Sequence, residues 1–454
     1  MKCSAYNKSV SYVESLILPS GEKFPASLGL KRMRVLLDKL DNPQNAFQSI
    51  HIAGTSGKGS TAYLIAKIIE KHGYRVGLHL SPHLQTIRER FIINSLLITE
   101  EEFVKLVSDT RPIISQVSNQ FKSPVTYFEA LLAMVFLFFK NRKVNFGVIE
   151  TGLGGTYDGT NVLNSLITII TKIGFDHTNI LGTTISEIAS QKAGIVKSSN
   201  IACISQKQSK EAEKMIRDRA VKLQVPLYIQ ENDYFVHKKT CTSNGSTFTY
   251  QDEKHKFNNV QLSLLGEYQI ENAGGVIRTV IGLGEIGFKT NQKIIRYVLS
   301  NAKFPGRFEH VKKYNYEWIL DGAHNRDKMS AFINSLDNLF PKKEKIAIIG
   351  FKKDKDVYSC LRLVVGQFST IICTQPQALT DIGMAIDPSE LKKQLNELPF
   401  KGKLLIIKNI KLAIHYIKNN FPKSTLCVIT GSLYLVGEAR DELKLPFTLS
   451  NGFS

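Results

Sequence analysis

The stretch GTSGKGST at residues 54–61 has the composition of a phosphate-binding turn. A short apolar strand ending at Ala53 precedes it, and the segment AYLIAKIIEKHG, whose apolar residues recur at helical spacing, follows it. The first N–H groups of a helix have no internal partner and carry the positive end of its dipole, and glycines let the backbone close around phosphate oxygens. This order of strand, glycine turn and helix predicts phosphate binding, although a glycine-rich turn alone is often only a turn.

Each residue type in the turn has an expected role. Lys58 would place a point charge on the outer phosphates, and the hydroxyl of Ser60 or Thr61 would face a Mg²⁺ ion. The motif differs from the common Walker form, because only two residues separate its first two glycines and a third glycine follows the lysine. The predicted ATP-binding turn consists of Gly54, Thr55, Ser56, Gly57, Lys58, Gly59, Ser60 and Thr61.

Acidic and imidazole side chains follow the ends of several predicted strands, where open α/β sheets place their sites. Glu150 ends the run FGVIE, Asp176 and His177 follow TIITKIGF, and Asp321 and His324 follow EWIL. A carboxylate at a strand end near a phosphate turn commonly holds Mg²⁺ on a nucleotide, so Glu150 is a candidate metal ligand. The alternatives are a helix-cap or surface carboxylate for Glu150 and a packed, non-ligating imidazole for His177.

Strands alternate with helices along the chain, which predicts parallel sheets covered on both faces. Residues 233–262 are rich in Thr, Lys and aromatic residues, which predicts a segment of antiparallel strands outside the parallel sheet. The stretch FPGRFE at residues 304–309 contains Pro and Gly, which predict a loop that can link two domains. We therefore predict an ATP-binding N-terminal and central domain over residues 1–303, a hinge linker over 304–309, and a smaller α/β domain over 310–454.

Composition narrows the class of protein. The 43% apolar and 22% charged content is that of a globular protein, and no apolar run reaches the ~18 residues of a membrane span. The six cysteines have no paired spacing, and the N-terminus has no apolar signal region, so we expect a cytoplasmic protein with reduced thiols. The net charge of +19 would suit nucleic acid or polyanionic small substrates, but the lysines are dispersed, which favours a solvated basic surface.

Taken together, the motifs resemble the folylpolyglutamate synthase and dihydrofolate synthase family, the folate branch of the Mur-type amide ligases. The resemblance implies a P-loop-containing Mur-ligase-type central domain with a parallel sheet, followed by a smaller Rossmann-like α/β C-terminal domain. Ten ordered motifs carry it through nearly the whole chain: GTSGKGST at 54–61, SPHL at 81–84, RERFIIN at 88–94, TYFEAL at 126–131, ETGLGG at 150–155, DHTNILGTTISEIASQKAGIVK at 176–197, GEYQIENA at 266–273, FPGRFE at 304–309, DGAHN at 321–325 and TGSLYLVGEAR at 430–440.

The resemblance also implies ligands for the nucleotide and the metal. Asn272, Arg307 and Asp321 would contact ATP in addition to the glycine turn. By itself Lys192 would be a surface or paired charge in an apolar helix, but it matches a lysine that the family carboxylates with CO₂. The implied catalytic residues are Lys58, Lys192 and His324, and the implied Mg²⁺ ligands are Ser81, Glu150, His177 and Lys192 as carboxylysine.

For the acceptor substrate, the resemblance implies a folate or pteroate site. Three positions depart from the family pattern: Thr156 and Gly159 replace the usual arginine and alanine, and Gln191 replaces a glutamate before Lys192. The first two bear on the choice between dihydropteroate and a reduced folate. The implied acceptor site consists of Thr126, Tyr127, Phe128, Glu129, Tyr157, Asp158 and Gly159.

The implied reaction is ATP-dependent amide formation. The substrate carboxylate takes the γ-phosphoryl group to give an acyl phosphate, and the amine of L-glutamate attacks it, releasing phosphate alongside ADP. Expected partners are small molecules (a folate or dihydropteroate, L-glutamate and ATP), with no nucleic acid or membrane, and the expected state is a monomer. The alternatives are a related ligase that uses another carboxylate, a P-loop ATPase switch and a basic nucleic-acid-binding module.

Overall fold

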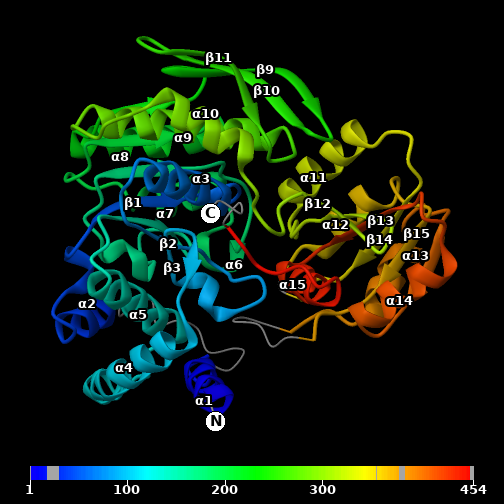
Figure 1. Cartoon of the computed structure of the whole chain (residues 1–454), viewed down its shortest axis with the longest axis horizontal. Helices are drawn as coiled ribbons and strands as arrows, with labels where there is room; N and C mark the ends of the chain where they lie inside the picture. Colours follow the sequence, from blue (N-terminus) through cyan, green and yellow to red (C-terminus); the bar gives the residue numbers. More distant parts are fainter. Residues whose placement is uncertain (1, 18–29, 354, 378–383, 450–454) are drawn as a thin grey trace.

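The structure is a computed structural model, and it describes residues 2–17, 30–353, 355–377 and 384–449. Two α/β units lie side by side, each built around its own mostly parallel sheet, and a small antiparallel sheet covers one side of the first unit (Figure 1). No helix within the described ranges is long and apolar enough to cross a membrane. The cysteines described there as free thiols are Cys203, Cys241, Cys360, Cys373 and Cys427.

The first unit contains an eight-stranded sheet in the order β4-β3-β2-β5-β1-β6-β7-β8. The six strands from β2 to β8 in this order run parallel, and β3 and β4 form an antiparallel edge. Because parallel strands end at the same edge, the residues that follow β1, β2, β5 and β6 are brought together there. The strands are β1 Gln48–Ala53, β2 Val76–His79, β3 Ile92–Ile93, β4 Leu96–Leu97, β5 Phe146–Glu150, β6 Ile167–Ile170, β7 Ala202–Ser205 and β8 Leu227–Ile229.

Helices cover both faces of this sheet, as the fully buried strands β2, β5, β6 and β7 require. One face packs against α3 Lys58–Lys71, α9 Tyr268–Gly284 and α10 Gln292–Asn301, and the antiparallel strands β9 Tyr234–Thr242, β10 Gly245–Asp252 and β11 Lys256–Leu262 pack on the same cluster. The other face packs against α5 Tyr127–Asn141, α7 Ile185–Ala193 and α8 Lys210–Leu223. The helices α1 Lys2–Glu14, α2 Lys31–Asp38 and α4 Glu100–Phe121 pack in turn on α5. Shorter elements are η2 Pro43–Asn45, η3 Ile87–Arg90, η4 Gly159–Val162 and α6 Thr178–Leu181.

The second unit contains a six-stranded sheet in the order β12-β13-β17-β14-β15-β16, parallel except for β12. Its strands are β12 Glu309–Lys313, β13 Tyr316–Leu320, β14 Lys345–Ile349, β15 Thr370–Cys373, β16 Lys403–Ile406 and β17 Leu426–Thr430. One face packs against α11 Arg326–Leu339, α12 Val357–Val364 and α13 Pro388–Asn396, and the other against α14 Ile410–Asn420 and α15 Leu433–Glu442.

The predicted architecture of a parallel P-loop unit followed by a smaller α/β unit is confirmed. Strand β12 is a difference from the sequence analysis, which placed no strand between the hinge linker and β13. Its sequence EHVKK is charged, as is common for an edge strand, and a tight turn at Tyr314 and Asn315, both with positive φ, pairs it with β13. The second sheet therefore starts at the last residue of the predicted linker.

Candidate active site

The glycine turn has the geometry of an anion-binding loop. Gly54 and Gly57 have φ of 147° and 88°, and the N–H groups of Thr55 and Ser56 donate to the carbonyl of Lys172 at 2.9 and 3.1 Å. Helix α3 begins at Lys58, and Gly57 at its N-cap supplies no side-chain hydrogen bond. The first N–H groups of α3 are therefore left for an anion, as the sequence predicts.

Lys58, Ser81 and Glu150 lie together beside this turn. Lys58 Nζ is 3.8 Å from Glu150 Oε1, and the N–H of Ser81 donates to Glu150 Oε2 at 3.1 Å. Glu150 is only 5% exposed. Burial raises the pKa of the Glu150 carboxyl, while the Lys58 charge and the Ser81 N–H oppose that rise. The carboxylate is thus held in a largely dry position where a cation would favour its charged form.

Lys192, near the end of α7, points into the same region. Its Nζ donates to the carbonyl of Gly54 at 2.8 Å, and the residue is only 4% exposed. Burial, followed by the charge of Lys58, lowers the pKa of Lys192 to about 7. Near neutral pH, a large share of this amine is unprotonated, which is the form that attacks CO₂.

The loop after β6 meets the second unit through a charged cluster around Asp176. The carboxylate of Asp176 lies 2.9 Å from Lys355 Nζ and 3.5 Å from Lys328 Nζ. The same two ammonium groups contact imidazoles, Lys355 at 3.1 Å from His177 Nε2 and Lys328 at 3.1 Å from His324 Nε2. Burial raises the pKa of Asp176, but the surrounding positive charges outweigh burial and hold this pKa well below its usual range. This cluster joins the two units electrostatically.

Asp321 and Arg307 lie where the chain passes from the first unit to the second, at the predicted hinge linker. Asp321 accepts hydrogen bonds from the N–H groups of Phe308 and Ala323, both at 2.8 Å. Burial raises the pKa of Asp321, and the Phe308 N–H and the Arg307 charge oppose the rise. The Arg307 guanidinium lies over the ring of Phe304, 5.5 Å from its centroid. Asp321 therefore fixes the backbone on the C-terminal side of Arg307.

Asn272, on α9, closes the glycine turn from the other side. A Cβ added to Gly57 would lie 2.3 Å from Asn272 Oδ1, so only glycine fits at this approach. The amide of Asn272 accepts from Gln206 Nε2 at 2.9 Å and donates to Gln269 Oε1 at 2.8 Å. Gln269 Nε2 in turn donates to Ser60 Oγ at 3.2 Å, so α9 and α3 share one buried amide chain.

Known proteins share both the sequence motifs and this fold. Two family models match, Mur ligase middle domain over residues 52–280 and dihydrofolate synthetase C-terminal domain over residues 305–444. The dihydrofolate synthase/folylpolyglutamate synthase of Bacillus subtilis is 30% identical over 97% of this chain and 100% of its own. The crystal structure of folylpolyglutamate synthase from Thermotoga maritima is 32% identical, covers 98% of each chain and has a TM-score of 0.84. An FPGS–AMPPCP–folate complex is 28% identical, covers 96% and 99%, and has a TM-score of 0.81.

The chain belongs to the folylpolyglutamate synthase/dihydrofolate synthase family. It is accordingly a ligase that forms carbon–nitrogen bonds. The Mur-ligase fold expected from the sequence is confirmed by the same matches.

In this family member, the residues predicted to line the acceptor site hold the N-terminus of α5. Thr126 is the N-cap, and Thr126 and Glu129 form a capping box. The Glu129 carboxylate also receives Arg32 Nη2 at 2.7 Å and Arg32 Nε at 3.1 Å, and both side chains are almost fully buried. The Glu129 carboxylate therefore has a structural partner, and Tyr127 next to the cap is itself buried.

Replacing Glu129 by alanine is expected to lower the free energy of unfolding by about 3–5 kcal/mol, because it leaves the Arg32 guanidinium buried without its partner. Urea unfolding followed by circular dichroism measures this change. The matched control is Asp109→Ala, which removes the partner of the exposed Lys105 and should cost under about 1 kcal/mol. A loss for Glu129→Ala as small as that of the control would contradict the structural role.

The remaining predicted acceptor residues surround a short turn after β5. Asp158 is buried and accepts from the N–H groups of Leu153 at 2.7 Å and Thr160 at 3.0 Å. Tyr157 beside it is 55% exposed, and Phe128 is half-buried. A Cβ added to Gly159 would lie 2.8 Å from Leu132 Cδ1, so in this chain a leucine on α5 fills the space beside the family's usual alanine position. The Tyr157 ring is the predicted acceptor residue that faces solvent.

Two residues of the charged cluster, Lys328 and Lys355, were missing from the predicted site. Asp176 was predicted as a strand-end carboxylate, but its role as the centre of the ion pairs was not predicted. Lys328 stands in the first turn of α11, only four residues after His324, so its closeness in sequence to the predicted DGAHN motif was a signal for it. Lys355 gave no such signal, since its contacts are with residues 178 and 179 positions earlier in the chain.

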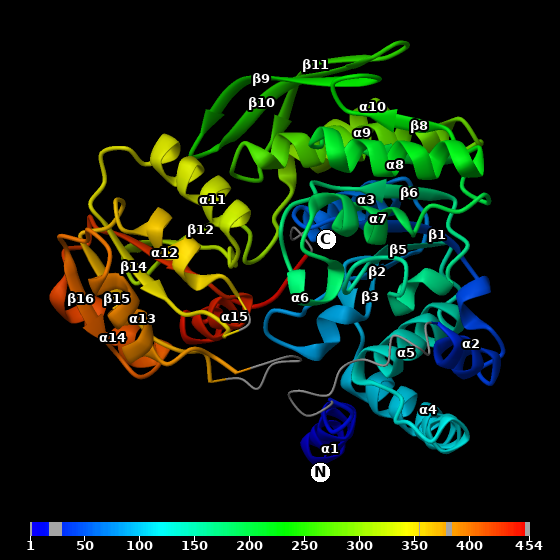
Figure 2. The ribbon, with the colours of Figure 1, turned by 180° about the vertical axis from the view of Figure 1, so that it is seen from behind.

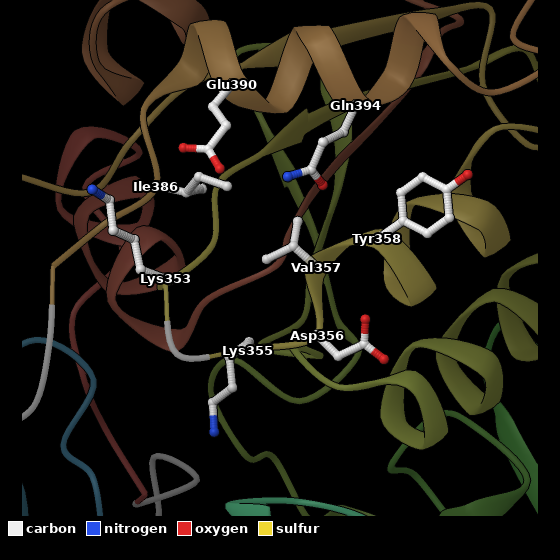
Figure 3. Close-up of a pocket in the computed structure, with 8 residues that line it drawn as sticks. All are labelled: Lys353, Lys355, Asp356, Val357, Tyr358, Ile386, Glu390 and Gln394. Atoms are coloured by element: carbon white, nitrogen blue, oxygen red, sulfur yellow. The ribbon is translucent and has the colours of Figure 1, made fainter. Parts of the chain in front are cut away.

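A cavity of about 430 Å³ lies in the second unit beside this cluster, lined by Lys353, Lys355, Asp356, Val357, Tyr358, Ile386, Glu390 and Gln394 (Figure 3). Figure 3 shows the Lys355 side chain pointing away from Glu390 and Gln394, which agrees with its contact to Asp176. A smaller cavity of about 20 Å³ lies at the junction of the units, where Glu150 and Arg307 both line it.

Proposed function

We propose that this protein uses ATP to join L-glutamate to the carboxyl group of a pteroate or a folate through an acyl phosphate. The names of its relatives support both acceptors, because the Bacillus subtilis protein is named for dihydrofolate and folylpolyglutamate synthesis and one solved relative binds AMPPCP with folate. We further propose a cytoplasmic monomer, and the free thiols of the described cysteines support a reducing compartment.

The observation that carries the proposal is the position of Lys328. Its charge acts on the pKa of Glu150 and Asp176 from the first unit and of Asp321 from the second. This ammonium group, 3.5 Å from Asp176, therefore lies within electrostatic range of carboxylates at three separate strand ends. This arrangement supports a single reaction centre between the two units, next to the phosphate turn.

The residues around this centre suit phosphoryl transfer. The N-terminus of α3 and Lys58 would bind the outer phosphates of ATP, and Arg307 would reach the nucleotide from the hinge. The carboxylate of Glu150 is the hard oxygen donor that Mg²⁺ prefers, with Ser81 and His177 as further candidates, whereas Lys192 fits only as a carboxylysine. Mg²⁺ bound there would neutralise charge on the phosphates during transfer.

His324 would act by positioning Lys328. Its Nδ1 lies 2.7 Å from the carbonyl of Gly322, which can only accept, so Nδ1 carries the proton. Burial and the Lys328 charge hold the pKa of His324 well below its usual range, so the imidazole is neutral. Its Nε2 lone pair is therefore free to accept from Lys328 Nζ at 3.1 Å. This contact would aim the ammonium at charge that develops on the acyl phosphate.

Closure of the junction would protect the acyl phosphate from water. The cavity between Glu150 and Arg307 has room for about one water molecule in this structure, so little water would remain beside Glu150 when the units are together. Substrates would enter when the units separate, and the reaction would follow their closure.

Release of inorganic phosphate from ATP tests the proposal directly. We expect turnover only when L-glutamate and an acceptor are both present, since glutamate must capture the acyl phosphate. Running dihydropteroate and tetrahydrofolate in parallel assigns the acceptor. Equal phosphate release without either co-substrate, or release stimulated by DNA or RNA, would contradict the ligase activity. Turnover with glutamate and an unrelated carboxylate, but neither pteroate nor folate, would contradict the proposed acceptor.

A further inference from the structure

Arg440, on α15, is a buried arginine at the junction of the two units, with only 2% of its surface exposed. Its Nη1 forms an ion pair with Glu309, the first residue of β12. Its Nε donates to Gln85 Oε1 at 2.9 Å, and its Nη2 donates to the carbonyl of Pro446 at 2.9 Å. One guanidinium therefore connects the hinge, the loop that follows β2, and the segment after α15.

The loop after β2 carries Ser81 and is tightly ordered around a buried carboxylate. Glu89 accepts from the N–H groups of Leu84, Gln85 and Thr86 at 2.6, 2.7 and 2.8 Å. Burial raises the pKa of Glu89, while these three N–H groups and, to a smaller extent, the Arg440 charge oppose that rise. The loop that presents Ser81 to Glu150 is thus held by Glu89 from within and by Arg440 from the second unit.

Helix α15 packs directly on this loop. A Cβ added to Gly437 would lie 1.9 Å from the carbonyl oxygen of Leu84, so the helix backbone and the loop backbone are in contact. The Leu84 side chain packs on the core of the second unit, although the loop belongs in sequence to the first. Figure 2 shows α15 beside the loop that precedes β3 from the opposite side to Figure 1.

Glu309, the partner of Arg440 in this ion pair, also holds the backbone of the predicted hinge linker. Glu309 pairs with Arg440 through Oε1 and accepts the N–H of Gly306 at 2.8 Å through Oε2. Gly306 immediately precedes Arg307. The carboxylate that receives Arg440 therefore also fixes the backbone on the N-terminal side of Arg307.

We propose that Arg440 is a positioning residue that couples the Ser81 loop to the Arg307 hinge, so that both reach the nucleotide in one arrangement of the two units. An arginine suits this task because its rigid fork bonds in several directions at once, which a lysine ammonium on a flexible stem does not reproduce. The inference rests on the proposed function only in naming magnesium nucleotide as the ligand of Ser81 and Arg307. The contacts themselves hold for any ligand at the junction.

Hydrogen exchange tests the coupling without requiring catalysis. In Arg440→Gln, amides in peptides covering residues 81–90 and 304–309 are expected to exchange at least about tenfold faster, because a charge-assisted hydrogen bond is lost at both places. The matched control is Arg278→Gln, which removes another buried arginine that pairs with a glutamate, Glu285 at 3.1 Å. It should leave both peptides unchanged. Faster exchange in only one of the two peptides, or in neither, would overturn the coupling.

Nucleotide binding distinguishes positioning from a general loss of stability. Calorimetry with AMPPCP and Mg²⁺ is expected to show at least about fivefold weaker binding for Arg440→Gln, for Arg440→Lys and for the milder Gln85→Ala. In the double variant of Gln85→Ala and Arg440→Gln, the losses should be less than additive, because both act through one contact. Unchanged affinity in all three single variants, or fully additive losses, would overturn the proposal even if ligation itself were absent.

Discussion

Replacing Lys192 by alanine is expected to lower the rate of ligation by at least about 100-fold with the fold intact, because it removes the side chain that, as a carboxylysine, would bind Mg²⁺ at the phosphates. The buried amine has a pKa of about 7 and lies 2.8 Å from the carbonyl of Gly54, at the start of the phosphate turn. Steady-state phosphate release measures the rate. Carbon NMR after addition of ¹³C-labelled bicarbonate measures the carbamate on the lysine directly.

The sign of the pH effect follows from the lowered pKa of Lys192. Below a pKa of about 7 the amine is protonated and does not react with CO₂, so carbamate and activity should both fall as the pH drops through 7. Added bicarbonate should raise activity most on the alkaline side. Lys192→Arg keeps a cation but cannot form the carbamate, and it should be as inactive as the alanine variant.

The matched control for Lys192 is Lys197→Ala. Lys197 is also a lysine with a lowered pKa, about 8, but its ammonium is hydrogen-bonded to the carbonyls of Asn161 and Leu163. We expect this variant to keep the bicarbonate-derived NMR signal. Full turnover of Lys192→Ala, or a carbamate signal that persists in it, would contradict the carboxylysine assignment.

The second large effect is expected for Glu150→Gln. The substitution keeps the shape of the side chain and removes its charge, so Mg²⁺-dependent turnover should fall by about 10²–10³-fold. The Ser81 N–H, which donates to Glu150 at 3.1 Å, still finds the amide oxygen, so circular dichroism should be unchanged. Titration of activity with Mg²⁺ is the decisive measurement.

Glu102→Gln is the control for this variant, because Glu102 lies in the capping box of α4, where glutamine serves equally well. It should behave as the unmodified protein does. If Glu150→Gln retained the same Mg²⁺ dependence as this control, Glu150 would not be a metal ligand.

Local features of the site were predictable because they depend on neighbouring residues. The strand that ends at Ala53 and the glycine turn stand where the sequence placed them. The helix also follows the turn, but it begins at Lys58, four residues before the segment AYLIAKIIEKHG that predicted it. The same reasoning was incomplete at Thr126. Its T-x-x-E spacing to Glu129 is a capping-box signal, as at Thr99, and it was interpreted only as part of an acceptor site.

Contacts between the units were not predictable, because they join residues far apart in the chain. Nothing around Lys355 indicates that its ammonium reaches Asp176, and nothing around Arg440 indicates Gln85. The burial of Lys192 is of the same kind. In sequence it is a lysine in an amphipathic helix, and only packing of α7 against the glycine turn removes its amine from water and changes its pKa.

The first residue of β12 has a mechanical consequence for nucleotide binding. Because β12 begins at Glu309 and Asp321 holds the N–H of Phe308, Arg307 has almost no slack relative to the second sheet. Any rotation of the second unit relative to the first would therefore displace the Arg307 guanidinium, because no flexible linker separates Arg307 from the second sheet. The affinity of the protein for nucleotide should consequently depend on the angle between the two units.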